Sequence, residues 1–152
     1  MQQSYDVFFA SSNVHKYEEA KEILAEFGIE LGFFQTNLVE IQEDSLSKIA
    51  EQKVLDAFNR CKKPVIVEDD GLFIDSLSGF PGPFSSYVFK TIGNNGILKL
   101  IGNNRTAQFR AVIAFCDAIS DKESDWISIK SVWKNSNFIP NLSRIFFASS
   151  YL

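Results

Sequence analysis

The sequence predicts one α/β domain over its 152 residues. Short apolar runs typical of buried strands alternate along it with stretches whose apolar residues recur at helical spacing. Strands interleaved with helices indicate a sheet covered by helices. The hydrophobic share of 45% and the charged share of 22% are ordinary for a globular chain of this length.

The first half of the chain supplies four of the predicted elements. They are a strand at residues 5–10, a helix from Tyr17 that Gly28 ends, a strand at 29–34, and a helix that Ser45 opens and Lys63-Pro64 breaks.

The second half begins with residues 65–67, a wholly apolar, β-branched run typical of a central strand. Helical stretches around 87–92 and 97–101 flank a predicted turn at 93–96, and 107–116 alternate as a strand. Beyond Asp117 neither periodicity is clean, although 125–133 could form a strand.

Composition also limits the partners and the compartment. A net charge of −4 argues against broad nucleic-acid binding. No apolar run approaches the 18 residues of a membrane span, and the N-terminus does not resemble a signal peptide. Cys61 and Cys116 fit no metal-ligand spacing. We therefore expect a cytoplasmic protein with free thiols.

The first candidate site is Ser11-Ser12-Asn13-Val14-His15-Lys16, where the first strand meets the first helix. Unpaired backbone N–H groups and the helix dipole attract anions at such a turn. The side chains of Ser11, Ser12 and Asn13 add hydrogen-bond donors, and Lys16 adds a full charge in a turn where the dipole disfavours it. A phosphate chain would explain that lysine, but helix capping beside a solvated lysine is the more common pattern.

The second candidate site is Glu68-Asp69-Asp70-Gly71, directly after the apolar strand. Ligands collect at the carboxyl ends of strands in open α/β sheets. Adjacent carboxylates repel each other unless a cation or a proton relieves them, and Mg²⁺ prefers such oxygen ligands. A magnesium site and a solvated acidic loop are equally good readings of this segment.

Three further features are weak when taken alone. Glu40 could be a metal ligand or the outward residue of an edge strand. Lys53 lies on the polar side of the second predicted helix, where a lysine is usually solvated. Residues 78–87, SGFPGPFSSY, predict a turn-rich connection.

Taken together, these motifs resemble the inosine triphosphate pyrophosphatases over residues 5–117. SSNVHK is similar to the family's Thr-Gly-Asn-x-x-Lys turn, and VEDDGLFIDSLSGFPGPFSSY resembles its signature of an acidic pair followed by Gly-x-Pro-Gly-x-Tyr-Ser. Glu40 and Lys53 match a metal-binding glutamate and a helical lysine of the family.

The resemblance implies a mixed sheet in an elongated two-lobed α/β fold, usually a homodimer, that uses Mg²⁺ to hydrolyse non-standard purine triphosphates (ITP, XTP, dITP) to monophosphate and pyrophosphate. It also implies three groups of site residues. The triphosphate would bind Ser11, Ser12, Asn13, Lys16, Lys53 and Asp70; the metal would bind Glu40, Glu68 and Asp69; and Asp69 would activate the attacking water.

The sequence departs from the family pattern at three places. Ser12 replaces a glycine, and Asp70 replaces a small hydroxyl residue. Residues 118–152 match poorly and lack the base-binding motifs, including Ser-His-Arg, because the single histidine is His15. We expect a C-terminal part that is either strongly diverged or altered in reading frame or truncated near residue 118. The alternative function is a vestigial nucleotide-binding domain without base recognition.

Overall fold

The computed structural model describes residues 4–117 and 127–133, the second range for its backbone alone. Its elements are β1 (Val7–Ser11), α1 (Val14–Ala25), β2 (Leu31–Gln35), α2 (Leu46–Cys61), β3 (Val65–Ile74), a 3-10 turn η1 (Asp75–Leu77), β4 (Pro81–Gly82), α3 (Ser85–Thr91), α4 (Gly93–Ile101), β5 (Ala107–Cys116) and β6 (Ile127–Trp133). The α/β prediction is confirmed. Of the poorly matching residues 118–152, only the backbone of 127–133 is described.

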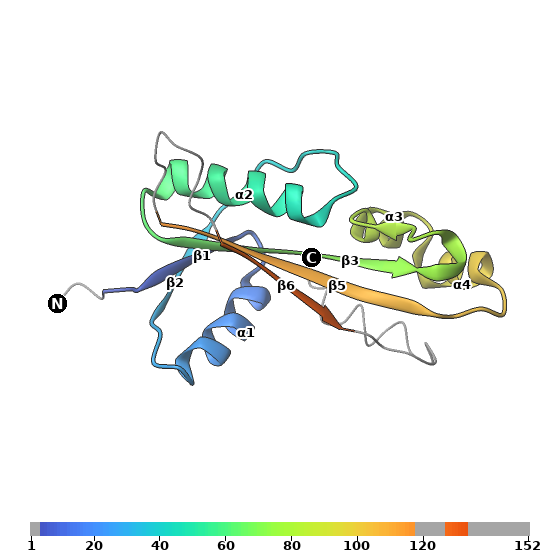
Figure 1. Ribbon diagram of the computed structural model, residues 1–152, viewed down its shortest axis with the longest axis horizontal. Coiled ribbons are helices and arrows are strands. Elements are labelled where there is room, and N and C mark those ends of the chain that lie inside the picture. The colour runs from blue at the N-terminus through green and yellow to red at the C-terminus, as the bar shows by residue number, and fades with distance from the viewer. Residues whose placement is uncertain (1–3, 118–126, 134–152) are drawn as a thin grey trace. The chain divides into compact units, whose positions relative to one another are not determined.

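The strands form a sheet in the order β2-β1-β3-β5-β6, with β4 paired to β3 outside this order. β1 runs parallel to both β2 and β3, whereas β4 runs antiparallel to β3. The predicted mixed sheet flanked by helices is therefore confirmed (Figure 1). In the described residues no helix has the length and apolarity needed to cross a membrane.

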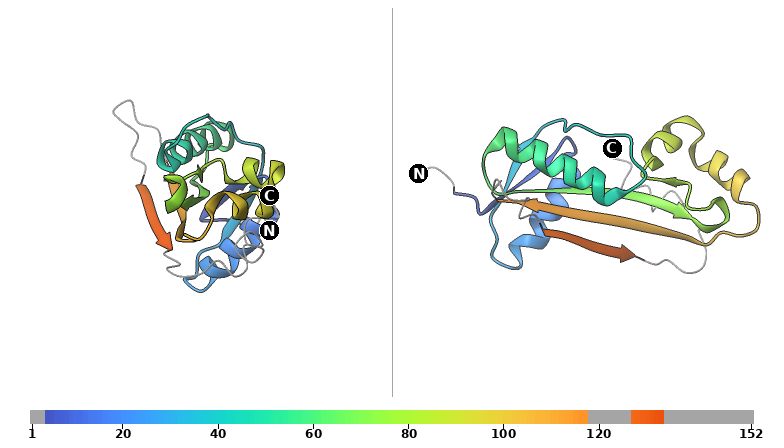
Figure 2. Two further views of the ribbon diagram at one scale, coloured as in Figure 1. Left: turned by 90° about the vertical axis from the view of Figure 1, so that its right-hand side faces the viewer. Right: turned by 45° about the horizontal axis from the view of Figure 1, so that its top comes forward.

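The chain divides into two compact units, and the first comprises the described residues of 1–42, 47–68 and 112–129. Two crossovers build it: α1 joins β1 to β2, and α2 returns past β1 to β3. Right-handed crossovers that move in opposite directions along a sheet place their helices on opposite faces. Figures 1 and 2 show α1 and α2 on the two sides of the sheet.

The two helices of this unit are held differently. α2 buries Ile49, Ala50, Val54 and Ala57, a helical repeat that faces the core. α1 buries no residue fully. Its Tyr17 ring stacks on Phe33 of β2 with 4.3 Å between the ring centroids, and the Tyr17 hydroxyl donates to the Leu31 carbonyl at 3.2 Å.

The second unit comprises the described residues of 43–46, 69–111 and 130–152. Its core joins Leu72 and Ile74 of β3 to Val88 of α3 and to Ile97 and Ile101 of α4. The turn predicted at 93–96 is wrong, because these residues form the first turn of α4. Gly93 adopts φ +62°, and the chain passes directly from α3 into α4 there.

The acidic segment also differs from its prediction. Glu68, Asp69 and Asp70 do not form a loop after a short strand but lie inside the ten-residue strand β3. Leu72 and Phe73 pair with Gly82 and Pro81 of β4, so the chain stays extended beyond the acids.

Candidate functional site

The turn between β1 and α1 is organised by Asn13. Its Oδ1 accepts the backbone N–H groups of His15 at 2.9 Å and Lys16 at 3.4 Å, and its own N–H donates to Ser11 Oγ at 3.0 Å. Asn13 is 6% exposed, and its buried Nδ2 group has no hydrogen-bond partner among the described residues. The capping predicted for this turn is confirmed, and one buried amide donor remains for another acceptor. Ser12 is exposed beside it.

Lys16 is directed toward β3. Its Nζ lies 2.6 Å from Glu68 Oε2, with side chains only 13% and 18% exposed. The parallel register pairs Phe8 with Val65 and Phe9 with Ile66, which sets Glu68 of β3 level with Ser11 at the end of β1. A cation in the first helical turn is therefore balanced by a carboxylate from the neighbouring strand.

Lys53 forms the second lysine–carboxylate pair of the first unit. Its Nζ lies 2.8 Å from Glu40 Oε1, and the Lys53 side chain is 10% exposed while that of Glu40 is 73% exposed. The prediction that Lys53 lies on the polar side of its helix is wrong. It lies on the buried face between Ala50 and Ala57, because its long apolar stem packs there while its ammonium reaches Glu40.

The loop that carries Glu40 is tied to α2 by Asp56 and Arg60, which sequence reasoning missed. Asp56 accepts Arg60 Nε at 3.1 Å and Nη2 at 2.8 Å, and it also accepts the Val39 N–H at 3.0 Å. Arg60 Nη1 donates to Thr36 Oγ1 and to the Asn37 carbonyl, both at 2.9 Å. This network fixes the chain next to Glu40. The spacing of Asp56 and Arg60 on one helix face was the available signal.

Asp69 and Asp70 belong to the second unit. Asp69 Oδ1 accepts the Asp70 N–H at 3.1 Å, which orients the Asp69 carboxylate along β3. Both residues are half-buried.

The expected Mg²⁺ ligands can be compared with this geometry. Their carboxylate oxygens are of the type that Mg²⁺ prefers. In the described part of the chain, however, no three Asp, Glu, His or Cys side chains gather closely enough to hold a metal. Glu68 and Glu40 instead hold the ammonium groups of Lys16 and Lys53. The donor chemistry therefore fits a cation at these carboxylates, and lysines supply the positive charge in this structure.

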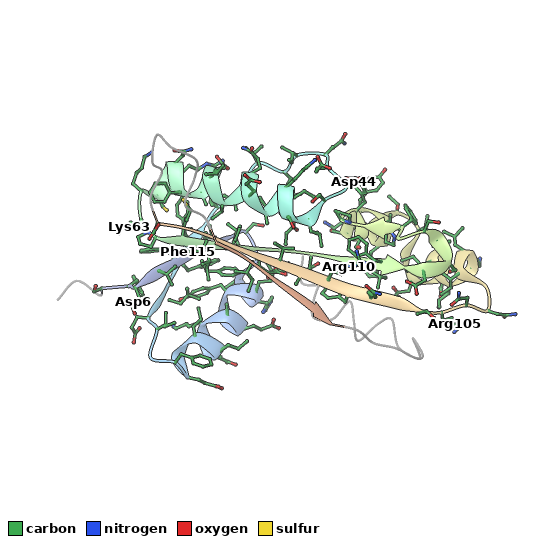
Figure 3. The ribbon with its side chains drawn as sticks, in the orientation of Figure 1. Asp6, Asp44, Lys63, Arg105, Arg110 and Phe115 are labelled. Carbon is green, nitrogen blue, oxygen red and sulfur yellow. The ribbon has the colours of Figure 1, made fainter. Side chains whose placement is uncertain are left out.

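The second unit also contains a cavity of about 640 Å³ that sequence reasoning missed. The Arg110 guanidinium lies 4.2 Å from the centre of the Phe73 ring on its wall, and Arg110 and Asp44 are labelled in Figure 3. The segment expected to be a plain connection forms much of the lining, which comprises Asp44, Phe73, Asp75, residues 78–84 and Arg110.

These features define an α/β protein in which an asparagine-capped turn carries a lysine that pairs with an acidic residue of the neighbouring parallel strand. The chain belongs to the Ham1 family, whose model matches residues 7–134. The resemblance drawn from residues 5–117 is thereby confirmed at the level of the family.

Several relatives carry the name dITP/XTP pyrophosphatase. The chain is 50% identical over 113 residues to that of Methanopyrus kandleri, covering 73% of this chain and 60% of the relative. It is 44% identical over 110 residues to that of Hyperthermus butylicus, covering 71% and 58%. The chain thus spans about three-fifths of the length of these relatives.

Solved structures agree on the fold. A HAM1 protein from Coxiella burnetii superposes with a TM-score of 0.68 at 23% identity, over 86% of this chain and 72% of that one. A nucleoside-triphosphatase / dITP/XTP pyrophosphatase from Mycobacterium abscessus superposes with a TM-score of 0.64 at 22% identity, over 86% and 73%.

Proposed function

We propose that this chain is an enzyme that hydrolyses non-standard purine nucleoside triphosphates (ITP, XTP and dITP) to the monophosphate and pyrophosphate with Mg²⁺. The observation that carries the proposal is the Lys16–Glu68 pair at 2.6 Å, where a cationic, asparagine-capped turn meets an acidic strand. The names of the relatives support this substrate class.

The residues of the turn bind the triphosphate. The buried Asn13 Nδ2 supplies a donor, the Ser11 and Ser12 hydroxyls add others, and Lys16 supplies charge. Lys53 and Asp70 complete the substrate contacts that we infer from the family resemblance. Donors fixed before the substrate arrives need little reorganisation when it binds.

Glu40, Glu68 and Asp69 are the residues that would hold Mg²⁺. Bound there, the metal would neutralise phosphate charge and lower the pKa of a water molecule. Asp69 takes a proton from the attacking water. Because the products are a monophosphate and pyrophosphate, the bond that breaks is the one between the α- and β-phosphates. Lys16 balances the negative charge on the phosphates while this bond breaks.

Pyrophosphate release from ITP with Mg²⁺ tests the proposal, with Asp69→Asn as the decisive variant. This change keeps the side-chain shape but removes the base, so the rate should fall about 10²- to 10⁴-fold while nucleotide still binds. Asp117→Asn, at an exposed position after β5, is the matched control and should keep the parent rate.

If Asp69→Asn retained the parent rate, Asp69 would not be the base. If the parent chain bound ITP without releasing pyrophosphate, the alternative of a non-catalytic nucleotide-binding domain would hold instead.

A homodimer and a cytoplasmic location belong to the same proposal. The family resemblance supports the first, and the sequence composition supports the second. Light scattering of the purified chain tests the dimer, and a mass of one protomer across concentrations would contradict it.

A further inference from the structure

Ser85, the first residue of α3, places a buried hydroxyl between β3 and β4. Its side chain is almost fully enclosed, with the residue 4% exposed. Ser85 Oγ accepts the backbone N–H of Leu72 at 2.7 Å and donates to the Gly82 carbonyl at 2.5 Å. One hydroxyl thus satisfies a donor on one strand and an acceptor on the other.

This hydroxyl reinforces the pairing of β3 with β4. β4 has only two residues, and Pro81 has no N–H to offer β3. Leu72 stands opposite Gly82 in the antiparallel register, and Ser85 also links the Leu72 N–H to the Gly82 carbonyl. A buried water often bridges two backbone groups in this way, and here a covalently fixed side chain does so. We call this arrangement the Ser85 bridge.

Glycine at position 71 allows the two backbones to approach at the Ser85 bridge. A Cβ added at Gly71 would lie 2.5 Å from the Gly82 carbonyl oxygen and 2.8 Å from its carbon. The Ser85 bridge and this close contact act on consecutive residues, Gly71 and Leu72, and fix the backbone of β3 there.

We propose that Ser85 is a positioning residue for Asp69. The fixed segment begins two residues after Asp69, and the Asp70 N–H already binds the Asp69 carboxylate at 3.1 Å. The position of a catalytic carboxylate relative to its water depends on how firmly its backbone is held. A misplacement of the carboxylate by about 1 Å can lower the rate about 10²-fold. This inference rests on the proposed function, in which Asp69 is the base.

The test compares Ser85→Ala and Ser85→Cys with Ser86→Ala, the same change at the adjacent half-buried serine. Ser85→Cys keeps the packing, but its thiol is a weak donor and acceptor. Both Ser85 variants should lower kcat about 10- to 100-fold with KM unchanged, because the lost interaction acts on the reacting geometry rather than on binding. Ser86→Ala should keep both constants.

Amide hydrogen exchange of the full chain supplies a readout that does not need activity. The Leu72 amide should exchange at least about tenfold faster in both Ser85 variants, while the Phe9 amide in β1 keeps its protection. A uniform loss of protection in Ser85→Ala would mark unfolding of that variant. The exchange rate of the Leu72 amide in Ser85→Cys would then decide whether the hydroxyl holds the two strands together.

Unchanged kcat in Ser85→Cys, or unchanged exchange at Leu72, would overturn the positioning role. If the parent chain hydrolysed no nucleoside triphosphate, the proposed function and the role of Ser85 in it would both be wrong. Faster exchange at Leu72 would still show that the hydroxyl bridges the strands.

Discussion

At the scale of single residues, lysine in the first turn of α1 is the informative feature. The helix dipole disfavours it, so another charge must compensate. Glu68 supplies that charge at 2.6 Å, and the side chains of both are largely buried. The buried Nδ2 group of Asn13, the cap residue of the same helix, has no hydrogen-bond partner among the described residues. The N-terminus of α1 therefore carries one charged donor, the Lys16 ammonium, and one uncharged donor, the Asn13 amide.

Lys16→Ala should weaken triphosphate binding about 10- to 100-fold, the range for one lost hydrogen bond to a charged group. The same change removes the partner of Glu68, so Tm should fall by about 5 °C. Titration of a fluorescent nucleotide and a thermal melt measure the two effects. Lys21→Ala, at an exposed lysine of the same helix, is the control and should change neither. An unchanged Kd in Lys16→Ala would remove Lys16 from the phosphate site.

At the scale of elements, β3 performs two structural roles along its ten residues. Val65 and Val67 are buried in the first unit, and Leu72 and Ile74 are buried in the second. The buried positions change from odd to even numbers between them, so the strand exchanges its buried face. Glu68, Asp69 and Asp70 lie between these two buried runs and are themselves half-buried.

Gly71→Ala should lower the free energy of unfolding by about 2–3 kcal/mol, because its Cβ would meet backbone atoms of Gly82 that cannot move aside as a side chain can. Chemical denaturation measures the change. Gly28→Ala is the matched control: nothing lies within 4 Å of its Cβ, but its φ of +73° disfavours alanine by about 1 kcal/mol. Equal losses in the two variants would mean that crowding against β4 has no effect.

At the scale of the whole molecule, the contacts proposed for Lys16 and Lys53 are with phosphates, which all nucleoside triphosphates share. Base selection needs buried groups that pair with one base and are left unpaired by another. Residues after Asp117 carry no Ser-His-Arg motif, because the single histidine is His15.

We therefore expect weak turnover and a ratio of kcat/KM for ITP over ATP below about tenfold, far from the 10⁴-fold or more that a site built to hydrogen-bond its substrate can reach. Parallel assays of ITP, XTP, ATP and GTP measure the ratio. A strong preference for ITP would show that the chain contains a base pocket.

The sequence determined the order of the helices and of the strands other than the two-residue β4, because the spacing of apolar residues and the capping residues act over a few neighbours. It also determined the turn at Asn13, whose cap bonds reach only His15 and Lys16. The family followed from four motifs in order. Each of these features depends on residues that are close in the chain.

Tertiary structure alone decided what those residues contact. The partners of Lys16 and Lys53 lie 52 and 13 positions away (68 − 16 and 53 − 40), beyond the reach of any local pattern. The extension of β3 through the acids depends on pairing with β4, and the Ser85 bridge on a helix that follows it. Local propensity treats Lys53 as a surface residue and the acids as a loop. Packing of the buried face of α2 and hydrogen bonding at β4 override both, because contacts between distant segments contribute more free energy than local preference does.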